Sequence, residues 1–124
     1  RAWVGGNVGQ PLTERLLAPE RPEVAVMELS SFQLELFAPE YQGPEVEHRR
    51  SPASRLISVA GWSPPIAAIT NITPNHLDRH PSMEDYIQAK TNILRFQQAQ
   101  DIAVLNADDP VTASLALLVS VTAT

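Results

Sequence analysis

Residues 66–90, IAAITNITPNHLDRHPSMEDYIQAK, contain the change of pattern that decides the fold. Residues 66–72 are mostly apolar and β-branched, which is typical of a buried strand in a parallel sheet. A polar loop follows at residues 73–81. From Ser82 onward, apolar side chains recur at helical spacing through residue 97. A serine followed three residues later by an acid resembles a capping box. The stretch therefore predicts a strand, a loop and a helix in that order.

Strands alternate with helices along the rest of the chain as well. Further buried strands are predicted at residues 2–4, 23–29 and 101–106, and helices at residues 11–18 and 111–118. Asp109 and Pro110 suit the N-cap and first position of the last helix, whereas residues 119–124 fit a helix poorly. Residues 32–37 are apolar but of uncertain type. This order of elements predicts an α/β fold with a mostly parallel sheet.

Residues 38–65 interrupt the alternation. They contain five prolines and a charged cluster at residues 47–50, which argues against a regular element. A loop of this length inside a compact domain is uncommon and usually has a function. We therefore interpret this segment as a proline-rich insertion or long loop. With 124 residues, the chain corresponds to one domain or to part of a larger one.

Composition excludes several classes of protein. The net charge of −5 disfavours a general surface for nucleic acid or for anionic membranes. No run of apolar residues is long enough for a transmembrane helix. The absence of cysteine excludes disulfides and thiolate zinc sites, and the chain has three histidines, one of them far away at position 48. A zinc hydrolase is therefore disfavoured.

Lys90 is the one lysine among nine basic residues, and it falls within the apolar stripe of the predicted helix. The stem of such a lysine can pack while its amine reaches water. Alternatively, the amine is buried, and its pKa is then lowered because burial disfavours the charged form. A neutral amine can act as a nucleophile, or can react with CO₂ to give a carbamate whose oxygens suit Mg²⁺.

Polar residues follow several predicted strands, where ligands bind in open α/β sheets. They are Asn7 in the turn GGNVG, Glu28, Ser30 and Gln33 in ELSSFQLE, His76 in TPNHLDRH, and residues 106–109. Glu28 is either the first polar residue of a loop or a carboxylate that faces a metal or an ammonium group. The loop around His76 is either a solvated turn or a metal or phosphate site. Each of the other residues could equally have a structural role, in a turn or a helix cap.

Five motifs, taken in order, resemble the Mur ligases. They are GGNVGQPL at 5–12, ELSSFQLE at 28–35, NITPNHLDRH at 71–80, SMEDYIQAK at 82–90 and VLNADDP at 104–110. The resemblance is greatest to the members of this family that add D-glutamate. It covers residues 5 to 110, apart from the proline-rich stretch.

The resemblance implies an ATP-dependent ligase that joins D-glutamate to UDP-N-acetylmuramoyl-L-alanine through an acyl phosphate, in peptidoglycan synthesis. ATP and two Mg²⁺ ions are the implied cofactors. The implied location is the bacterial cytoplasm, with no nucleic-acid or membrane partner, and the full-length protein is expected to be a monomer.

The resemblance also implies roles for particular residues. Glu28 would bind the Mg²⁺ that holds the ATP phosphates, and His76 and a carbamylated Lys90 would bind the second ion. His76 and Lys90 are thereby the candidate catalytic residues. The substrate UDP-N-acetylmuramoyl-L-alanine would contact Asn7, Ser30 and Gln33.

The implied organisation is that residues 1–124 form part of a Rossmann-like central domain of the P-loop ATPase type. The pattern G-x-x-x-x-G-K-[ST] does not occur in these residues, so the phosphate loop would lie outside them. The amino-terminal UDP-binding domain and the carboxyl-terminal domain would lie outside them too. The chain by itself is therefore expected to be inactive.

Two alternatives remain. One is another Mur or folylpolyglutamate-type ligase, which would add a different amino acid. The other is a non-catalytic binding module with a degenerate ligase core, against which the joint presence of Glu28, His76 and Lys90 argues.

Overall fold

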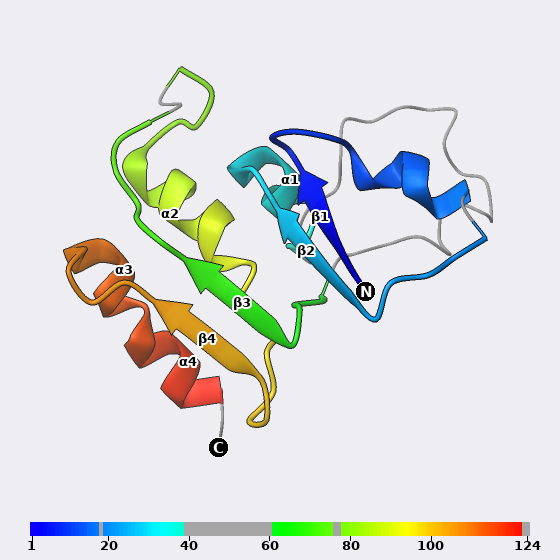
Figure 1. The fold of residues 1–124 in the computed structure, drawn as a ribbon. Coiled ribbons are helices and arrows are strands. Elements are labelled where there is room, and N and C mark those ends of the chain that lie inside the picture. The colour runs from blue at the N-terminus through cyan, green and yellow to red at the C-terminus, as the bar shows by residue number, and fades with distance from the viewer. Residues whose placement is uncertain (18, 39–60, 76–77, 123–124) are drawn as a thin grey trace. The chain divides into compact units, whose positions relative to one another are not determined.

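In a computed structural model, the described residues are 1–17, 19–38, 61–75 and 78–122. They form two compact units, residues 1–30 and residues 31–124, and Figure 1 shows the helices and strands of each. Most of the predicted insertion at 38–65 falls in residues 39–60, which lie outside the described part, as does His76.

The first unit is a pair of parallel strands. Strand β1 (Ala2–Gly6) pairs with β2 (Val24–Glu28) so that Ala2 lies opposite Val24 and Gly6 opposite Glu28. The 3₁₀ helix η1 (Leu12–Leu17) lies in the connection, where the sequence predicts a short helix. Trp3 in β1 is buried, whereas all five residues of β2 are exposed. The prediction that residues 23–29 form a buried strand is therefore wrong about burial, because the described residues of this unit do not cover the faces of β2.

The second unit contains the remaining elements. They are α1 (Ser31–Glu35), β3 (Ile66–Ile69), α2 (Met83–Thr91), β4 (Ile102–Leu105), α3 (Pro110–Ser114) and α4 (Ala116–Thr122). Strands β3 and β4 are parallel, with Ile66 opposite Ile102 and Ile69 opposite Leu105. The mixed α/β class with parallel strands is thus confirmed, but the described strands form two two-stranded sheets.

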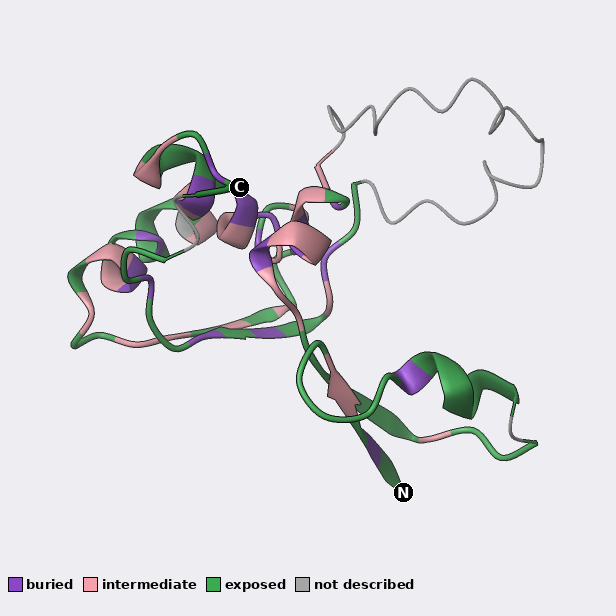
Figure 2. Ribbon diagram, turned by 90° about the horizontal axis from the view of Figure 1, so that it is seen from above, coloured by how far each residue is buried: buried purple, intermediate pink, exposed green. Residues whose placement is uncertain are grey.

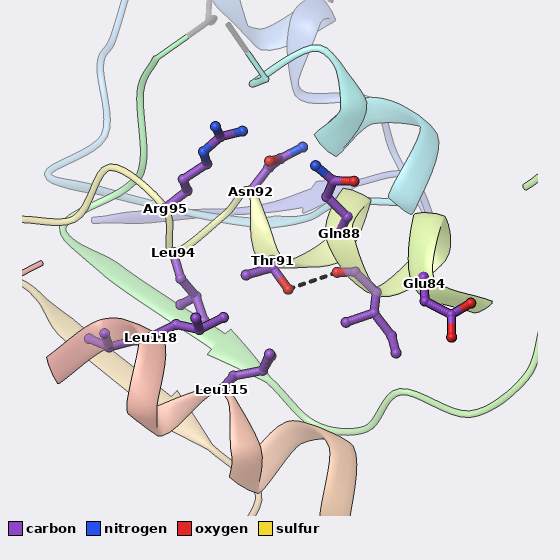
Figure 3. Close-up of a pocket in the computed structure, with 10 residues that line it drawn as sticks. Glu84, Gln88, Thr91, Asn92, Leu94, Arg95, Leu115 and Leu118 are labelled. Atoms are coloured by element: carbon purple, nitrogen blue, oxygen red, sulfur yellow. Dashed lines mark hydrogen bonds between the residues drawn. The ribbon is translucent and has the colours of Figure 1, made fainter. Parts of the chain in front are cut away.

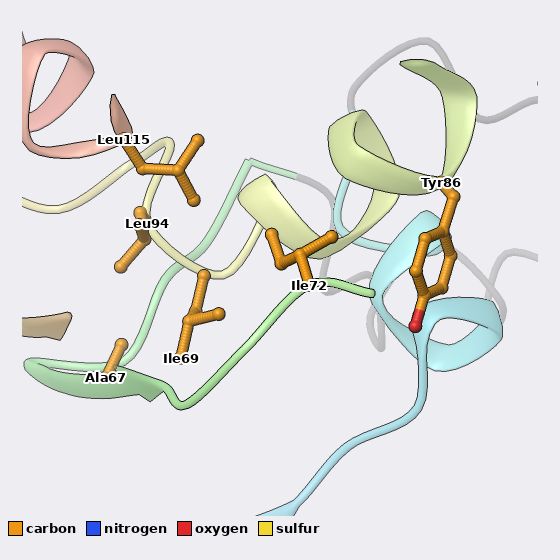
Figure 4. Close-up of a cluster of buried hydrophobic side chains, with 6 residues drawn as sticks. All are labelled: Ala67, Ile69, Ile72, Tyr86, Leu94 and Leu115. Atoms are coloured by element: carbon orange, nitrogen blue, oxygen red, sulfur yellow. The ribbon is translucent and has the colours of Figure 1, made fainter. Parts of the chain in front are cut away.

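The helices of this second unit pack on one face of the β3–β4 sheet (Figure 2). Burial along β3 alternates accordingly, with Ala67 and Ile69 buried and Ile66 exposed. The core cluster on this face consists of Ala67, Ile69, Ile72, Tyr86, Leu94 and Leu115 (Figure 4). Strands 66–72 and 101–106 were expected to be buried throughout. That expectation is wrong because the described helices cover one face only.

Helix α2 begins as the sequence predicts and ends earlier. The Ser82 hydroxyl accepts a hydrogen bond from the backbone N–H of Asp85 at 3.1 Å and donates one to its carboxylate at 2.7 Å. The helix stops at Thr91, however, and not at residue 97. The side chain of Asn92 is buried and donates to the Leu34 carbonyl at 3.2 Å, and the N–H of Phe96 donates to Ser63 Oγ at 3.0 Å. In a longer helix the Phe96 N–H would donate to the Asn92 carbonyl. Ser63 Oγ takes the place of that bond, since it accepts from the Phe96 N–H and donates to the Asn92 carbonyl at 3.2 Å.

The carboxyl-terminal helices begin at the predicted cap. The Asp109 carboxylate accepts from the Thr112 N–H at 2.7 Å, and Pro110 is the first residue of α3. The prediction that residues beyond 118 fit a helix poorly is wrong, since α4 continues to Thr122. The low helix propensity of β-branched residues is a weak preference, and the packing of the partly buried Val119 against the core outweighs it.

Residues on either side of the undescribed stretch 39–60 lie close together. The N–H of Gly61 donates to the Phe37 carbonyl at 2.8 Å, and the rings of Phe37 and Trp62 are 5.7 Å apart. A segment whose ends meet adds length without moving the elements that it connects.

The sequence left residues 32–37 without a predicted type. The short helix α1, Ser31–Glu35, contains the first four of them.

The N-cap of α3 makes stability depend on pH. The nearby Thr112 side chain, and then the Thr112 backbone N–H that donates to Oδ1 at 2.7 Å, lower the pKa of Asp109 below the ordinary value of 3.8. A lowered folded-state pKa stabilises the fold above the unfolded value, and this contribution is lost as pH falls through the folded value. Urea denaturation of the chain at about pH 5 and about pH 3 measures it. We expect Asp109→Asn, which keeps an N-cap side chain, to lose less stability over this interval than the unsubstituted protein.

Asp108→Asn is the matched control, since Asp108 is the exposed neighbouring acid. It should lose as much stability on acidification as the unsubstituted protein. An equal loss for Asp109→Asn and the unsubstituted protein would contradict this role of Asp109.

Candidate functional site

The carboxylate of Glu28 is held at the end of the β1–β2 pair. Parallel register places Gly6 opposite Glu28, so the turn that follows β1 lies beside the end of β2. The N–H of Asn7 donates to the Glu28 carbonyl at 2.9 Å, and the N–H of Val8 donates to its Oε2 at 2.6 Å. Glu28 is exposed, and its Oε1 takes no hydrogen bond within the described residues. The result is an oriented carboxylate with one oxygen open to solvent.

Glycine is required at position 6 for this arrangement. Its φ is +141°, in the region that side chains rarely adopt, and a Cβ would lie 2.1 Å from the Glu28 carbonyl oxygen. Gly9 also has a positive φ, of +85°, but nothing lies within 4 Å of its Cβ position. The two glycines therefore have different functions: Gly6 permits close approach to Glu28, and Gly9 permits the turn.

The structure brings together some of the predicted residues of the first unit. The exposed Asn7 is adjacent to Glu28 through its backbone hydrogen bond. Ser30, the last residue of the unit, is half-buried two positions after Glu28. Gln33 is half-buried in α1 of the second unit. His76 lies outside the described residues, so the predicted His76–Lys90 pair remains a prediction.

Lys90 lies in the last turn of α2 and is half-buried. Of the apolar residues whose stripe it shares in the sequence, Tyr86 and Leu94 are buried, and the others, Met83, Ile87 and Ile93, are half-buried like Lys90. Its Nζ lies 5.3 Å from the centre of the Tyr86 ring. An ammonium group at this distance is attracted to the ring face. Lys90 is therefore at the edge of the core, with its amine over an aromatic ring.

Sequence reasoning missed a buried polar cluster around His80. The imidazole is 3% exposed; its Nε2 lies 2.9 Å from Ser31 Oγ, and its Nδ1 lies 3.4 Å from Glu35 Oε1. Ser31 and Glu35 are the first and last residues of α1. The cluster thus joins the loop before α2 to both ends of α1. Their spacing of four residues indicates that Ser31 and Glu35 share a helix face. No pattern in the sequence links these two residues to His80.

Asn106 connects the ends of the second strand pair. Its side-chain amide donates to the Thr70 carbonyl at 2.9 Å, and its Oδ1 accepts from the Asp108 N–H at 3.0 Å. These bonds hold the loops after β3 and β4 together. The position of Asn106 at a strand end is thus explained by a structural role.

The described residues contain no group of three or more His, Cys, Asp or Glu side chains that could hold a metal ion. Of the predicted metal ligands, Glu28 offers a carboxylate that is oriented by a hydrogen bond from the Val8 N–H. Mg²⁺ in nucleotide sites is commonly held by one or two carboxylates together with phosphates and waters. The geometry of Glu28 therefore fits a metal that is completed by a phosphate ligand, and does not fit a closed protein cage.

A groove of about 560 Å³ lies on the second unit, lined by residues of α2, of the turn after it and of α4 (Figure 3). Its apolar wall includes Leu94, Leu115 and Leu118. None of the predicted site residues lines it. Glu84 and Arg95 are the charged residues of its lining, and the groove shares no residue with the candidate site.

The close approach at Gly6 generates a stability test. Gly6→Ala should destabilise the first unit by about 2 kcal/mol or more, since it combines an unfavourable φ with a backbone clash. Gly9→Ala should cost only about 1 kcal/mol, because it has the strain without the clash. Trp3 fluorescence during urea denaturation reports on this unit when Trp62 is replaced by Phe. Equal losses for the two variants would refute the close approach of Gly6 to Glu28.

Within the described part of the chain, no helix is both long and apolar enough to span a bilayer.

Comparison with known proteins agrees with the resemblance of the five motifs. The family described as the Mur ligase middle domain matches residues 44–123. The UDP-N-acetylmuramoylalanine–D-glutamate ligase of Symbiobacterium thermophilum is 44% identical over 114 residues, which is 92% of this chain and 20% of that protein. The ligases of the same name from Acetivibrio thermocellus and Geobacter metallireducens are each 38% identical, over 94% and 98% of this chain.

The chain spans about a fifth of the length of these curated relatives, at 20%, 20% and 22%. The family match covers more than half of the chain and contains three of the five motifs, those at 71–80, 82–90 and 104–110. The chain belongs to the Mur ligase family, and its residues 44–123 match the middle domain of that family.

Proposed function

We propose that this chain is part of an ATP-dependent ligase that adds D-glutamate to UDP-N-acetylmuramoyl-L-alanine in peptidoglycan synthesis. The observation that carries the proposal is the similarity, at 38–44% identity over more than nine tenths of the chain, to proteins named for this reaction. The solvent-open carboxylate of Glu28 supports it independently, since it lies at a carboxyl strand end, where ligands of such sheets bind.

ATP, when bound, would supply the phosphoryl group that activates the alanine carboxylate. Mg²⁺ would supply positive charge that neutralises the transferring phosphoryl group. Residues of this chain would hold and orient these groups, which is the larger part of catalysis in phosphoryl transfer. Glu28 would donate a carboxylate oxygen to one Mg²⁺, and the Val8 amide keeps that carboxylate oriented before the ion arrives. His76 and a carbamylated Lys90 would hold the second Mg²⁺.

The sugar-nucleotide substrate would contact Asn7, Ser30 and Gln33. Asn7 is suited to this because its side chain is exposed beside Glu28, in a turn that Gly6 and Gly9 allow to approach a ligand closely.

The finer assignments form part of the same proposal. Residues 1–124 would belong to a Rossmann-like central domain of the P-loop ATPase type. The amino-terminal UDP-binding domain and the carboxyl-terminal domain would lie outside them. The intact protein would be a cytoplasmic monomer.

Two alternative functions predict different results in one assay. A related Mur or folylpolyglutamate-type ligase would accept another amino acid in place of D-glutamate. A binding module with a degenerate core would release no phosphate with any amino acid. The test is therefore phosphate release by the intact protein that contains this chain, with ATP, UDP-N-acetylmuramoyl-L-alanine and each amino acid in turn.

We expect phosphate release to require D-glutamate and the sugar nucleotide together. Glu28→Gln should lower kcat by about 100-fold or more, because it removes the negative charge that would hold Mg²⁺ at the ATP phosphates. Lys90→Arg keeps the positive charge but cannot form a carbamate, and should lower kcat by about as much.

The matched control is Glu14→Gln, the same chemical change at an exposed position of η1. It should retain the kcat of the unsubstituted protein. Release with another amino acid, or without any, would reject the D-glutamate assignment. Full activity of both Glu28→Gln and Lys90→Arg would reject the proposed metal ligands.

A further inference from the structure

The imidazole of His80 is buried and each of its nitrogens faces a partner on α1. Its Nε2 lies 2.9 Å from the hydroxyl of Ser31, and Ser31 is itself 2% exposed. Its Nδ1 lies 3.4 Å from the carboxylate of Glu35, one helical turn further along α1. A buried polar ring is stable only when its nitrogens are paired. The position and tilt of this ring are therefore determined from both ends of α1.

The same imidazole packs against aromatic rings of two different helices. The ring of Phe32, in α1, is stacked on it with centres 5.2 Å apart and planes 4° apart. The ring of Tyr86, in α2, is tilted against it by 54° with centres also 5.2 Å apart. Tyr86 is 5% exposed, so its ring has little room to move. His80 thus packs against the Tyr86 ring and limits where that ring can lie relative to α1.

Tyr86 connects this cluster to Lys90. The two residues are one turn apart on α2, and the Lys90 Nζ lies 5.3 Å from the centre of the Tyr86 ring. A free lysine side chain has many rotamers and extends into water. Attraction to the ring face selects the rotamers that keep the amine against Tyr86. Since His80 packs against Tyr86, the place of the Lys90 amine depends on His80.

We propose that His80 is a positioning residue for Lys90: held by Ser31 and Glu35, it fixes the Tyr86 ring, and that ring holds the Lys90 amine in place. The consequence for catalysis rests on the proposed function, in which Lys90 carries a carbamate that binds Mg²⁺. Misplacing a catalytic group by about 1 Å can lower a rate about 100-fold. Substitution of His80 should therefore act on kcat more than on substrate binding.

The first measurement needs no catalytic activity. The intact protein, in bicarbonate-free buffer, is treated with ¹³C-formaldehyde and a reductant, which dimethylates lysine amines and keeps their charge. The Lys90 signal is identified by its loss in Lys90→Arg. Methyl groups over the face of a ring are shifted upfield, so we expect an upfield Lys90 signal that Tyr86→Phe retains and Tyr86→Leu loses.

His80→Leu should move this signal to the position of an exposed dimethyl-lysine. Ser31→Ala, a small change that removes one partner of the imidazole, should move it part of the way and remains informative if His80→Leu does not fold. Leu115→Val is the control, since it alters a residue that is 3% exposed elsewhere in the same core. It should leave the signal in place. An unchanged Lys90 signal in both His80→Leu and Ser31→Ala would overturn the proposal.

The second measurement is the kinetic split in the ligase assay. His80→Leu should lower kcat about tenfold or more while each KM changes less than about threefold, and Leu115→Val should change neither. Normal kcat in a folded His80→Leu protein would overturn the positioning role. An unsubstituted protein without ligase activity would instead reject the proposed function, and the NMR result alone would then decide whether His80 positions Lys90.

Discussion

The parallel pairing of β1 with β2 is the constraint on which the candidate site depends. It places Gly6 opposite Glu28, so that two successive amides of the following turn reach the backbone and the side chain of the same glutamate. A shift of one residue would turn the Glu28 side chain to the other face of the sheet and remove both contacts. The absence of a side chain at position 6 makes this approach possible. The glycine at position 6 thus allows the Glu28 carboxylate to be held in one orientation.

The second unit also holds a polar side chain in a fixed position, but it does so by packing between helices. Its sheet supplies a flat apolar face, and the helices packed on that face bring α1 close to α2. Between these two helices lies a buried imidazole that is bonded to α1 and packed against a ring of α2. Burial and polar pairing together give this contact one geometry, which neither would do alone. Lys90 is held at the margin of this core and not within it.

Local signals in the sequence were sufficient for the order of the elements. Apolar, β-branched runs locate all four described strands to within three residues, because a strand needs only a short run of such side chains. The caps at Ser82 and Asp109 were also predictable, since each cap bonds to a residue three positions away. The Mur ligase family was indicated by five motifs in order, and the family match at residues 44–123 confirms it.

The predictions that failed, and the features that were missed, all depend on contacts between residues that are far apart in the sequence. Strand burial depends on which faces the other elements cover. The end of α2 depends on Ser63, which bonds to residues 29 and 33 positions away. The His80 cluster joins residues that are 49 positions apart, and no periodic pattern connects them. The sequence singled out Lys90 by its place in the helix, but the position of its amine depends on the packing of Tyr86. Roles taken from the resemblance for Glu28, His76 and Lys90 remain proposals.

The central claim is that this chain belongs to an enzyme that uses ATP. Its one lysine, Lys90, follows Ala89, so the 124 residues contain no phosphate-binding G-x-x-x-x-G-K-[ST] loop. The most direct test is to sequence the reading frame upstream of Arg1 in the source DNA. We expect an apolar strand followed by G-x-x-x-x-G-K-[ST] in the same frame. A start codon immediately before Arg1, or a complete upstream frame without that loop, would contradict the claim and favour a binding module.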